Sequence, residues 1–308
     1  MAKIVLYPLR TLGIPATIDF VRNWGNSTGA HAWDVVWTKE KMVAFMGLEQ
    51  LPYEYNPFSI YPDSLTSIRF PAKVFRKTFS INKEIETWKE GLSSQDIPII
   101  LKDNKIKDVS DEYFPVTDIH WIALRESISD SLVYLSVYED DWKLAYAAKN
   151  RKNKTVVFKQ MKREMLYLPS VYRSGQVIPV DVPLTVDACG RTKRLQADVD
   201  KKISFTITSL YPALMEKIYA LDHQDELPKD IFKRIDAGSF RRKPVNGEVY
   251  QLQYWKNGCW QICAKNEAVE NKLVFKNIPS QALYILTGSN GKPLGRCFTL
   301  ENGKQIFW

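Results

Sequence analysis

Hydrophobic residues at the start of the chain first follow a helical spacing and then alternate with polar ones. Apolar residues share one face of a possible helix and a glycine is placed to end it, namely Ile4, Val5, Leu9, Leu12 and Gly13. Beyond Gly13, short alternating runs have the spacing of β-strands. The predicted elements are a helix at 2–12 and strands at 16–20, 31–37 and 42–46.

From 50 to 108 the chain shows no strong repeat. Prolines interrupt it at short intervals, at Pro52, Pro57, Pro62 and Pro71. One helix is predicted around 82–90. We interpret the whole segment as connecting structure packed on its neighbours.

Short apolar runs separated by turn residues recur after this segment, at spacings of roughly eight to twelve residues. This spacing is typical of an antiparallel β-sandwich. The runs predicted to be strands are 121–125, 132–138, 145–148, 156–159, 165–168, 176–180 and 183–186.

A charged stretch at 219–236 is predicted to be a linker or a short helical connector. Alternation returns beyond it, together with Asn-Gly pairs that favour tight hairpin turns. The runs are 249–255, 273–275 and 283–286, and the pairs are Asn257-Gly258, Asn290-Gly291 and Asn302-Gly303. We expect a second, smaller β-sandwich here.

The length of 308 residues allows several domains, because single hydrophobic cores stop growing at roughly 250 to 300 residues. The predicted fold is mainly β with a small α+β N-terminal part, followed by two antiparallel β-sandwich domains. The predicted segments are a partial N-terminal domain at 1–55, a connecting region at 56–108, a β-sandwich at 109–215, a connector at 216–236 and the smaller sandwich at 237–308.

The net charge is +8, but the basic residues are spread along the sequence. Their densest clusters, at 151–154, 162–163 and 241–243, are too short for a nucleic-acid-binding arm. We interpret the charge as a solvated basic face and expect no nucleic-acid partner. No run approaches the ~18 apolar residues of a membrane span. Pro8 and Arg10 interrupt the apolar stretch that a signal peptide would need.

Cysteine usage excludes a disulfide scaffold and predicts neither a metal site nor a cofactor. The chain contains Cys189, Cys259, Cys263 and Cys297, and the Cys259–Cys263 spacing lacks the partner pair of a zinc site. The last three are close in sequence. They predict either one disulfide to Cys297 in an oxidising compartment or, as the favoured alternative, buried free thiols.

The strongest motif lies near the start, where Leu9-Arg10-Thr11-Leu12-Gly13-Ile14-Pro15-Ala16 is followed by Gly29-Ala30-His31-Ala32-Trp33-Asp34-Val35-Val36-Trp37. The two runs together resemble the transglutaminase-like cysteine hydrolases and acyltransferases. In that superfamily a helix carrying the nucleophilic Cys runs into the first motif, and the base His opens a strand written His-x-Trp. The whole chain is also similar to large proteins of gut Bacteroidetes, in which such a domain precedes β-sandwich modules. Proteins of that kind are usually exported, although this chain shows no export signal.

The resemblance implies acyl transfer, in which a Cys thiolate attacks an amide or ester carbonyl and a His moves the proton. His31 matches the base; the alternative is an ordinary, satisfied strand histidine. The position of the nucleophile falls just before Met1, and Cys189 belongs to the predicted sandwich. We therefore expect the chain as given to be catalytically inactive.

The resemblance also implies an acid that orients the histidine, and Glu49 is the candidate for this role. Asp34 lies three residues along the strand from His31, so its side chain is expected on the opposite face. Asn23 and Trp24, in the loop before His31, and Trp33 of the motif are candidates for lining a substrate groove. The alternative for Trp24 is an aromatic ring packed in the core.

Two functions from different classes follow. The favoured one is a non-catalytic binding or scaffold protein that holds peptide, glycopeptide or glycan ligands, with exposed aromatics stacking on sugar faces. The alternative is a truncated form of a cysteine amidase or protease-like enzyme whose Cys lies upstream. Candidates for stacking are Tyr254, Trp255, Trp260 and Trp308. The sequence predicts no oligomeric state.

Overall fold

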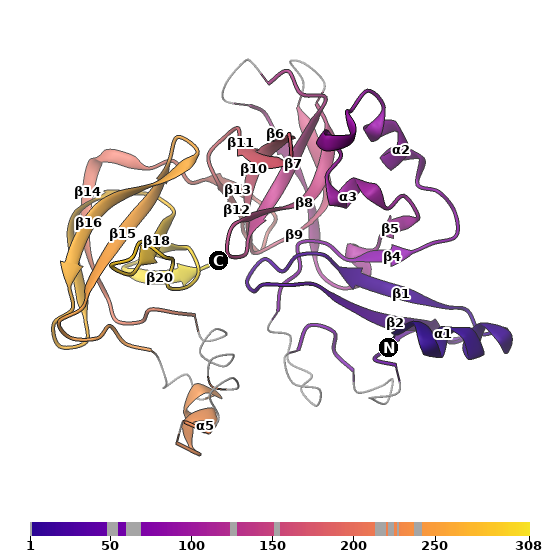
Figure 1. Ribbon diagram of the computed structural model, residues 1–308, viewed down its shortest axis with the longest axis horizontal. Helices are drawn as coiled ribbons and strands as arrows, with labels where there is room; N and C mark the ends of the chain where they lie inside the picture. Colours follow the sequence, from indigo (N-terminus) through magenta and orange to yellow (C-terminus); the bar gives the residue numbers. More distant parts are fainter. Residues whose placement is uncertain are drawn as a thin grey trace. The chain divides into compact units, whose positions relative to one another are not determined.

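The protein is mainly β, with antiparallel sheets throughout the computed structural model (Figure 1). The structure describes residues 2–47, 55–59, 69–123, 128–150, 155–212, 220, 225–226, 228–236 and 242–308. It divides into two compact units. The first comprises Met1–Asp181 and Thr185–Lys193, and the second comprises Val182–Leu184 and Arg194–Trp308.

The first unit opens with the predicted helix, α1 (Ala2–Thr11), which packs against the first two strands. Gly13 ends the helix with a φ of 76°, a left-handed conformation that glycine adopts without strain. The apolar face of the helix differs from the predicted one. Leu6 is buried, whereas Ile4 is 67% and Leu12 75% exposed.

A five-stranded sheet follows, in the order β3-β2-β1-β4-β5. Its members are β1 (Ala16–Val21), β2 (His31–Trp37), β3 (Met42–Phe45), β4 (Phe75–Lys77) and β5 (Ile106–Asp108). The first three confirm the predicted strands. The last two come from the region predicted to be connecting structure, so the sheet extends beyond residue 55. Asp19 of β1 lies opposite both Trp33 of β2 and Arg76 of β4.

Short helices between β4 and β5 cover one side of this unit, as Figure 1 shows. α2 (Lys83–Lys89) confirms the predicted helix, and the Asn82 side chain caps it by accepting from the backbone N–H groups of Glu84 and Ile85. The η1 turn (Ser94–Asp96) and α3 (Ile99–Lys102) follow. A further turn, η2 (Ser110–Glu112), follows β5.

The remaining strands of the first unit form a six-stranded sheet and a separate pair. The larger sheet runs β13-β12-β10-β7-β8, with β11 on β10, while β6 pairs with β9. The strands are β6 (Val116–Trp121), β7 (Leu132–Tyr138), β8 (Trp142–Lys149), β9 (Val156–Lys162), β10 (Met165–Arg173), β11 (Gln176–Pro179), β12 (Leu184–Val186) and β13 (Thr192–Arg194). The first of these starts earlier than the strand predicted at 121–125, and 124–127 lie outside the described residues.

One core joins this larger sheet to the N-terminal one. Phe75 of β4 and Trp88 of α2 pack in the same cluster as Leu132, Tyr134 and Leu144. The regions predicted as separate partial domain, connector and sandwich therefore form a single compact unit. Its boundary lies near Lys193, well before the predicted end of the sandwich at 215.

The second unit contains a two-stranded and a five-stranded antiparallel sheet that share a core. Its strands are β14 (Asp198–Ile207), β15 (Val249–Lys256), β16 (Cys259–Glu267), β17 (Leu273–Ser280), β18 (Tyr284–Thr287), β19 (Phe298–Glu301) and β20 (Lys304–Phe307). The charged connector holds α5 (Ile231–Asp236). The predicted turn between β15 and β16 has positive φ at both Asn257 and Gly258, as a type I′ hairpin requires.

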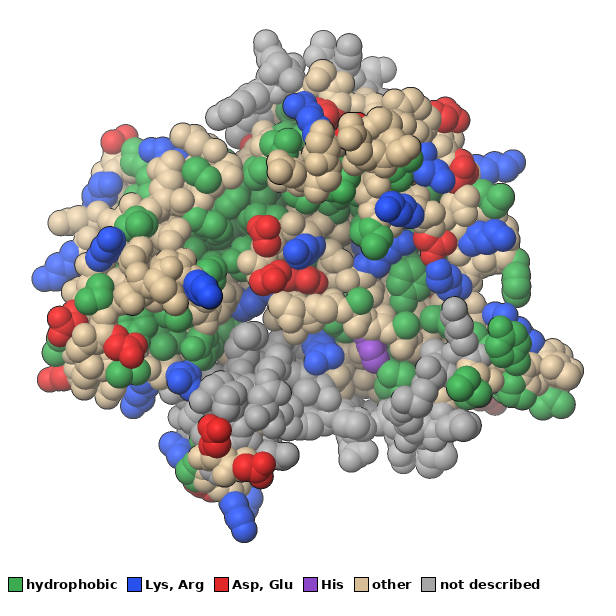
Figure 2. All heavy atoms as spheres, in the orientation of Figure 1, with side chains coloured by type: hydrophobic (Ala, Val, Ile, Leu, Met, Phe, Trp, Pro, Cys, Tyr) green, Lys and Arg blue, Asp and Glu red, His purple; other side chains and the backbone are tan. Residues whose placement is uncertain are grey.

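Lys and Arg side chains are interspersed with Asp and Glu over the face drawn in Figure 2.

No helix among the described residues is long and apolar enough to cross a membrane.

Candidate functional site

His31 opens β2 and lies among aromatic rings. Its imidazole centroid is 5.8 Å from the ring of Trp33, 6.4 Å from that of Trp24 and 6.5 Å from that of Tyr55. Trp33 is two residues along the same strand, so alternation places it on the same face as His31. The histidine is half-buried at the edge of an apolar cluster.

The imidazole makes one hydrogen bond to the described residues, between Nε2 and the Tyr55 hydroxyl at 2.6 Å. Burial lowers the pKa of His31, and the positive charge of Arg69 lowers it further. His31 is therefore a neutral imidazole at neutral pH, with one ring nitrogen occupied by a phenol.

Arg69 also lies near Trp24. Its guanidinium carbon is 5.7 Å from the centroid of a Trp24 ring. The Nε atom is buried and has no hydrogen-bond partner among the described residues. Burial lowers the pKa of Arg69, while Tyr55 raises it. The site thus combines a guanidinium, a neutral imidazole and a phenol around buried indoles.

Backbone contacts hold the two loops of this site together. The Arg69 N–H donates to the Phe58 carbonyl at 2.9 Å, and the Gly25 N–H donates to the Phe70 carbonyl at 2.6 Å. The Phe70 N–H in turn donates to Oδ1 of Asn26 at 2.7 Å. Loops of the chain that are distant in sequence are fixed in this way around the start of β2.

The predicted groove residues serve the core in this structure. Trp24 is 1% and Trp33 0% exposed. The Asn23 amide donates to the Leu144 carbonyl of β8 at 3.1 Å. This packing agrees with the alternative reading of Trp24 as a core aromatic, and neither indole presents an open face to a ligand.

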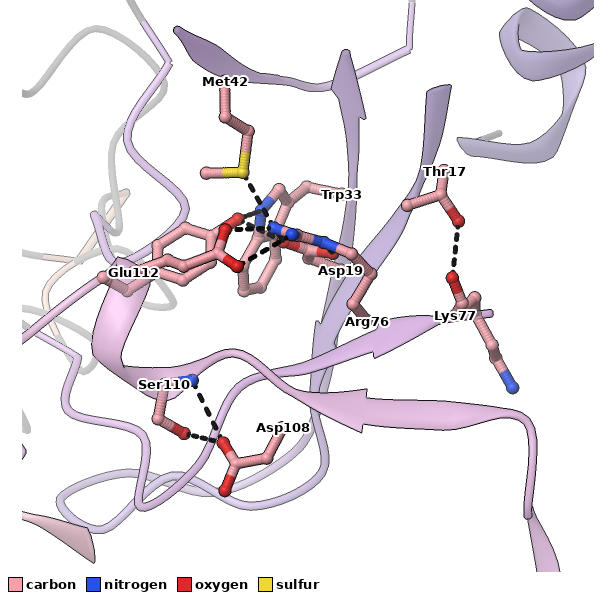
Figure 3. A network of polar contacts seen from close by, with 10 residues as sticks. Thr17, Asp19, Trp33, Met42, Arg76, Lys77, Asp108, Ser110 and Glu112 are labelled. Atoms are coloured by element: carbon pink, nitrogen blue, oxygen red, sulfur yellow. Dashed lines mark hydrogen bonds and ion pairs between the residues drawn. The ribbon is translucent and has the colours of Figure 1, made fainter. Parts of the chain in front are cut away.

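A buried polar network joins Trp33, two residues along β2 from His31, to Asp19 and Arg76 (Figure 3). The Trp33 indole donates to the Tyr113 hydroxyl at 3.0 Å, and that hydroxyl donates to Oδ2 of Asp19 at 2.6 Å. Arg76 donates to both Asp19 oxygens at 2.8 Å and to Oε1 of Glu112 at 3.0 Å. The register of the sheet brings these groups together, because Asp19 of the central strand β1 is opposite Trp33 of β2 on one side and Arg76 of β4 on the other.

The network fixes the charge states of its members. Burial disfavours the charged form of Arg76, but its bonds to Asp19 and Glu112 outweigh burial and raise its pKa. Burial and the neighbouring Asp19 carboxylate both raise the pKa of Tyr113. The network therefore contains the Arg76–Asp19 ion pair and the neutral Tyr113 phenol, which donates to Asp19. Through its bond from the Trp33 indole, Tyr113 also fixes the ring that packs beside His31.

Asp34 belongs to a different environment from His31. It is fully buried, its Oδ2 accepts the Gly47 N–H at 3.2 Å, and its Oδ1 has no partner. Burial raises the pKa of Asp34 to about 6, although the Gly47 hydrogen bond opposes this shift. Glu49, the predicted orienting acid, lies outside the described residues.

All four thiols are free. Cys189 is exposed in the turn between β12 and β13, Cys259 is also exposed, and Cys297 is buried. Cys263 is half-buried and donates to the Leu252 carbonyl at 3.4 Å. Among the residues that the structure describes, the rings around His31 come from Trp24, Trp33 and Tyr55.

A separate hollow with a volume of about 210 Å³ lies against α2, α3 and β8. Its walls include Trp88 and Tyr146, whose rings meet edge to face at 6.0 Å. Sequence patterns do not predict this hollow, because its lining residues come from several short elements.

The predicted stacking aromatics of the second unit are mostly packed inward. Tyr254 is 8% and Trp255 5% exposed. Trp260 lies edge-on to Trp255 at 5.0 Å, and the Trp308 indole donates to Oγ1 of Thr299 at 3.0 Å. Trp260 and Trp308 are half-buried, so they retain some surface for a ligand.

Comparison of the chain with protein-family models, with curated proteins and with solved structures finds no match. Within the described ranges, no three His, Cys, Asp or Glu side chains are grouped so that they could hold a metal ion.

Sequence reasoning identified His31 but missed Tyr55 and Arg69. Neither residue belongs to a recognisable motif, and both reach His31 only through tertiary contacts. Arg69 stands in the run Arg69-Phe70-Pro71, and nothing in this run predicts that its side chain lies near His31.

Proposed function

We propose that this protein is a non-catalytic, transglutaminase-like binding or scaffold protein for peptide, glycopeptide or glycan ligands. The proposal rests on the similarity of the N-terminal motifs to that superfamily. A helix leading into antiparallel strands, with His31 at the start of the second strand, is compatible with this assignment. The two sheets of the second unit, packed on one core, support a β-sandwich module there.

The observation that favours binding over catalysis is the environment of His31. Acyl transfer by a Cys–His pair needs the thiolate within hydrogen-bond reach of the imidazole. In the described part of the chain, His31 Nε2 is bound to the Tyr55 hydroxyl at 2.6 Å and its ring neighbours are aromatic. This arrangement suits a ligand-contacting imidazole better than a paired general base.

The second candidate function is that of a cysteine acyl-transfer enzyme whose nucleophile is supplied from upstream in the same gene product. The lowered pKa of His31, caused by burial and by Arg69, favours it, because a general base must be neutral at working pH. In this alternative the imidazole proton would reside on Nε2 and be donated to the Tyr55 hydroxyl, so that the unprotonated Nδ1 could remove the thiol proton.

A labelling experiment separates the two functions. The chain and a form extended upstream in frame are treated with a thiol-reactive, peptide-amide-mimicking probe, and intact mass reports the labelling. The binding proposal expects no labelling above that of a denatured control in either form, and ligand capture from peptide and glycan arrays by the folded chain. Labelling of the extended form alone, abolished by His31→Ala, would establish the enzyme instead. Absence of any ligand on the arrays would count against the binding proposal.

A further inference from the structure

Arg69 is a half-buried cation with no counter-ion among the residues that the structure describes. Its buried Nε has no hydrogen-bond partner, and none of the hydrogen bonds or ion pairs among the described residues involves its guanidinium. Removing part of a charged group from water without such a partner is unfavourable. An anion at this position would remove that penalty.

The surroundings of Arg69 are positive or neutral. Its guanidinium lies over Trp24, whose other neighbours include His31. A second cation, Lys162, lies over the adjacent Phe70 ring at 5.1 Å. The buried carboxylate beneath the site, Asp19, is already bound to Arg76.

Another carboxylate near the loop is also committed. Glu139 accepts the Trp24 N–H at 3.2 Å. Its pKa is raised, chiefly by burial. The carboxylates of Asp19 and Glu139 are thus bound to other donors, and neither is paired with Arg69 in the described part of the chain.

We propose that Arg69, together with His31 and Tyr55, binds a carboxylate group of the ligand. The planar guanidinium presents its donors in a fork that matches the two oxygens of a carboxylate. When the Tyr55 hydroxyl donates to Nε2 of His31, the imidazole proton resides on Nδ1, which becomes a further donor. The inference rests on the proposed binding function and names the chemistry of its ligand: a peptide carboxylate or the uronate of an acidic glycan.

Binding should be coupled to protonation of His31. The groups that face this imidazole are the Arg69 guanidinium, the Tyr55 hydroxyl and two uncharged indoles. A bound carboxylate offsets the positive field of Arg69 and so raises the pKa of His31. Affinity should therefore increase as pH falls through the His31 pKa of the complex, and should level off below the pKa of the free protein.

The test uses the full chain with isotope-labelled histidine, and NMR follows the His31 ring signals, assigned with His31→Gln. The probes are N-acetylglycine against its amide, glucuronate against glucose, and inorganic phosphate, all at matched ionic strength. We expect the acids to shift the His31 signals and the amide and glucose to leave them unchanged. Arg69→Gln should weaken binding by about tenfold or more. Arg173→Gln, which alters an exposed arginine paired with Asp130, is the matched control and should have no effect.

The proposal is overturned if Arg69→Gln binds the acids as tightly as the unaltered protein, if the amide binds as well as the acid, or if phosphate binds more tightly than either acid. Should Arg69→Gln not fold, Arg69→Lys keeps the charge without the fork and should still weaken binding. Binding of N-acetylglycine alone assigns the ligand to peptides, binding of glucuronate alone assigns it to acidic glycans, and both results support the proposal. Thiol labelling of the extended form would refute the non-catalytic function without touching this test.

Discussion

Replacing Asp19 by asparagine removes the charge at the centre of the buried network while preserving its shape. Asp19 is 0% exposed and accepts two bonds from Arg76 at 2.8 Å and one from Tyr113 at 2.6 Å. An amide offers one acceptor oxygen in place of two and turns an N–H donor toward the donors of Arg76 or Tyr113. Among the described residues, the guanidinium would keep Glu112, whose side chain is 34% exposed, as its remaining carboxylate partner.

The expected loss follows from burial and from the number of bonds. Breaking a buried, hydrogen-bonded ion pair by removing one partner costs about 3–5 kcal/mol. Domains unfold with about 5–15 kcal/mol in total, so the first unit should lose a large part of its stability. The matched control is Asp130→Asn, because Asp130 pairs with Arg173, which is 51% exposed, and such pairs contribute about 0–1 kcal/mol.

Hydrogen exchange read by mass spectrometry in increasing urea measures this loss in peptides that cover β1 and β2. A local readout is needed because a chain of two compact units need not unfold in one step. The reasoning is refuted if Asp19→Asn destabilises these peptides no more than Asp130→Asn does. A second readout is the His31 ring signal, which should move because Trp33 loses its support.

Further perturbations test other buried groups. Burial raises the pKa of Asp34 to about 6, above the ~3.9 of an unfolded chain, so the stability it contributes is present at low pH and lost as pH rises through its folded pKa. The free energy of unfolding of the unaltered protein should therefore decline with rising pH, and Asp34→Asn should remove up to about 2–3 kcal/mol of that decline. Equal pH slopes for the unaltered protein and Asp34→Asn would contradict this prediction. Lys73 is 2% exposed and donates to Asp108 and to the carbonyls of Lys159 and Gln160. Lys73→Met should cost about 3–5 kcal/mol in urea unfolding, whereas Lys77→Met, at the more exposed pair with Asp103, should cost about 0–1 kcal/mol; equal losses would refute the assignment. A Cβ on Gly25 would lie 1.8 Å from Cε of Met165 and 3.3 Å from the Phe70 carbonyl oxygen. Gly25→Ala should lower the free energy of unfolding by about 1–3 kcal/mol, and Met165→Ala in the same chain should recover part of this loss, since otherwise the clash is not its cause.

Local signals predicted the elements that depend on few tertiary contacts. The strand at Leu132–Tyr138 has the predicted bounds because its apolar run is long and flanked by turn residues. Gly13 and the Asn257-Gly258 pair mark a helix end and a hairpin through backbone conformations that few other residues adopt. In each case the physical cause lies within a few residues of sequence.

Other elements were missed because their partners are distant. β4 is only three residues long and shows no alternation, yet it joins the sheet by pairing Arg76 with Asp19. β14 begins with a run of charged residues, and register shifts in its pairing with β17 disturb the expected alternation. A sequence pattern does not predict a strand that forms only because it pairs with a strand distant in sequence.

The same distinction between local and distant determinants applies to the candidate site. His31 was predicted because its motif is contiguous, whereas Tyr55 and Arg69 reach it through separate loops. Trp24 and Trp33 were candidates for lining a groove, with core packing as the favoured alternative for Trp24, and both are buried in this structure. Their burial could not be predicted from the motif, because exposure is a tertiary property.

Several buried cations of the first unit have acceptors within the fold, and this contrast supports the inference about Arg69. Arg76 has the carboxylates of Asp19 and Glu112, and Lys73 has Asp108 with two backbone carbonyls. Even Arg22, whose pKa burial lowers, donates to the Ile100 carbonyl. The fold thus supplies acceptors to cations that it removes from water, in keeping with the cost of an unpaired buried charge. Among the residues that the structure describes, half-buried Arg69 has the Trp24 ring as a neighbour but no such acceptor. This contrast with the other buried cations is why we propose that a ligand supplies the acceptor.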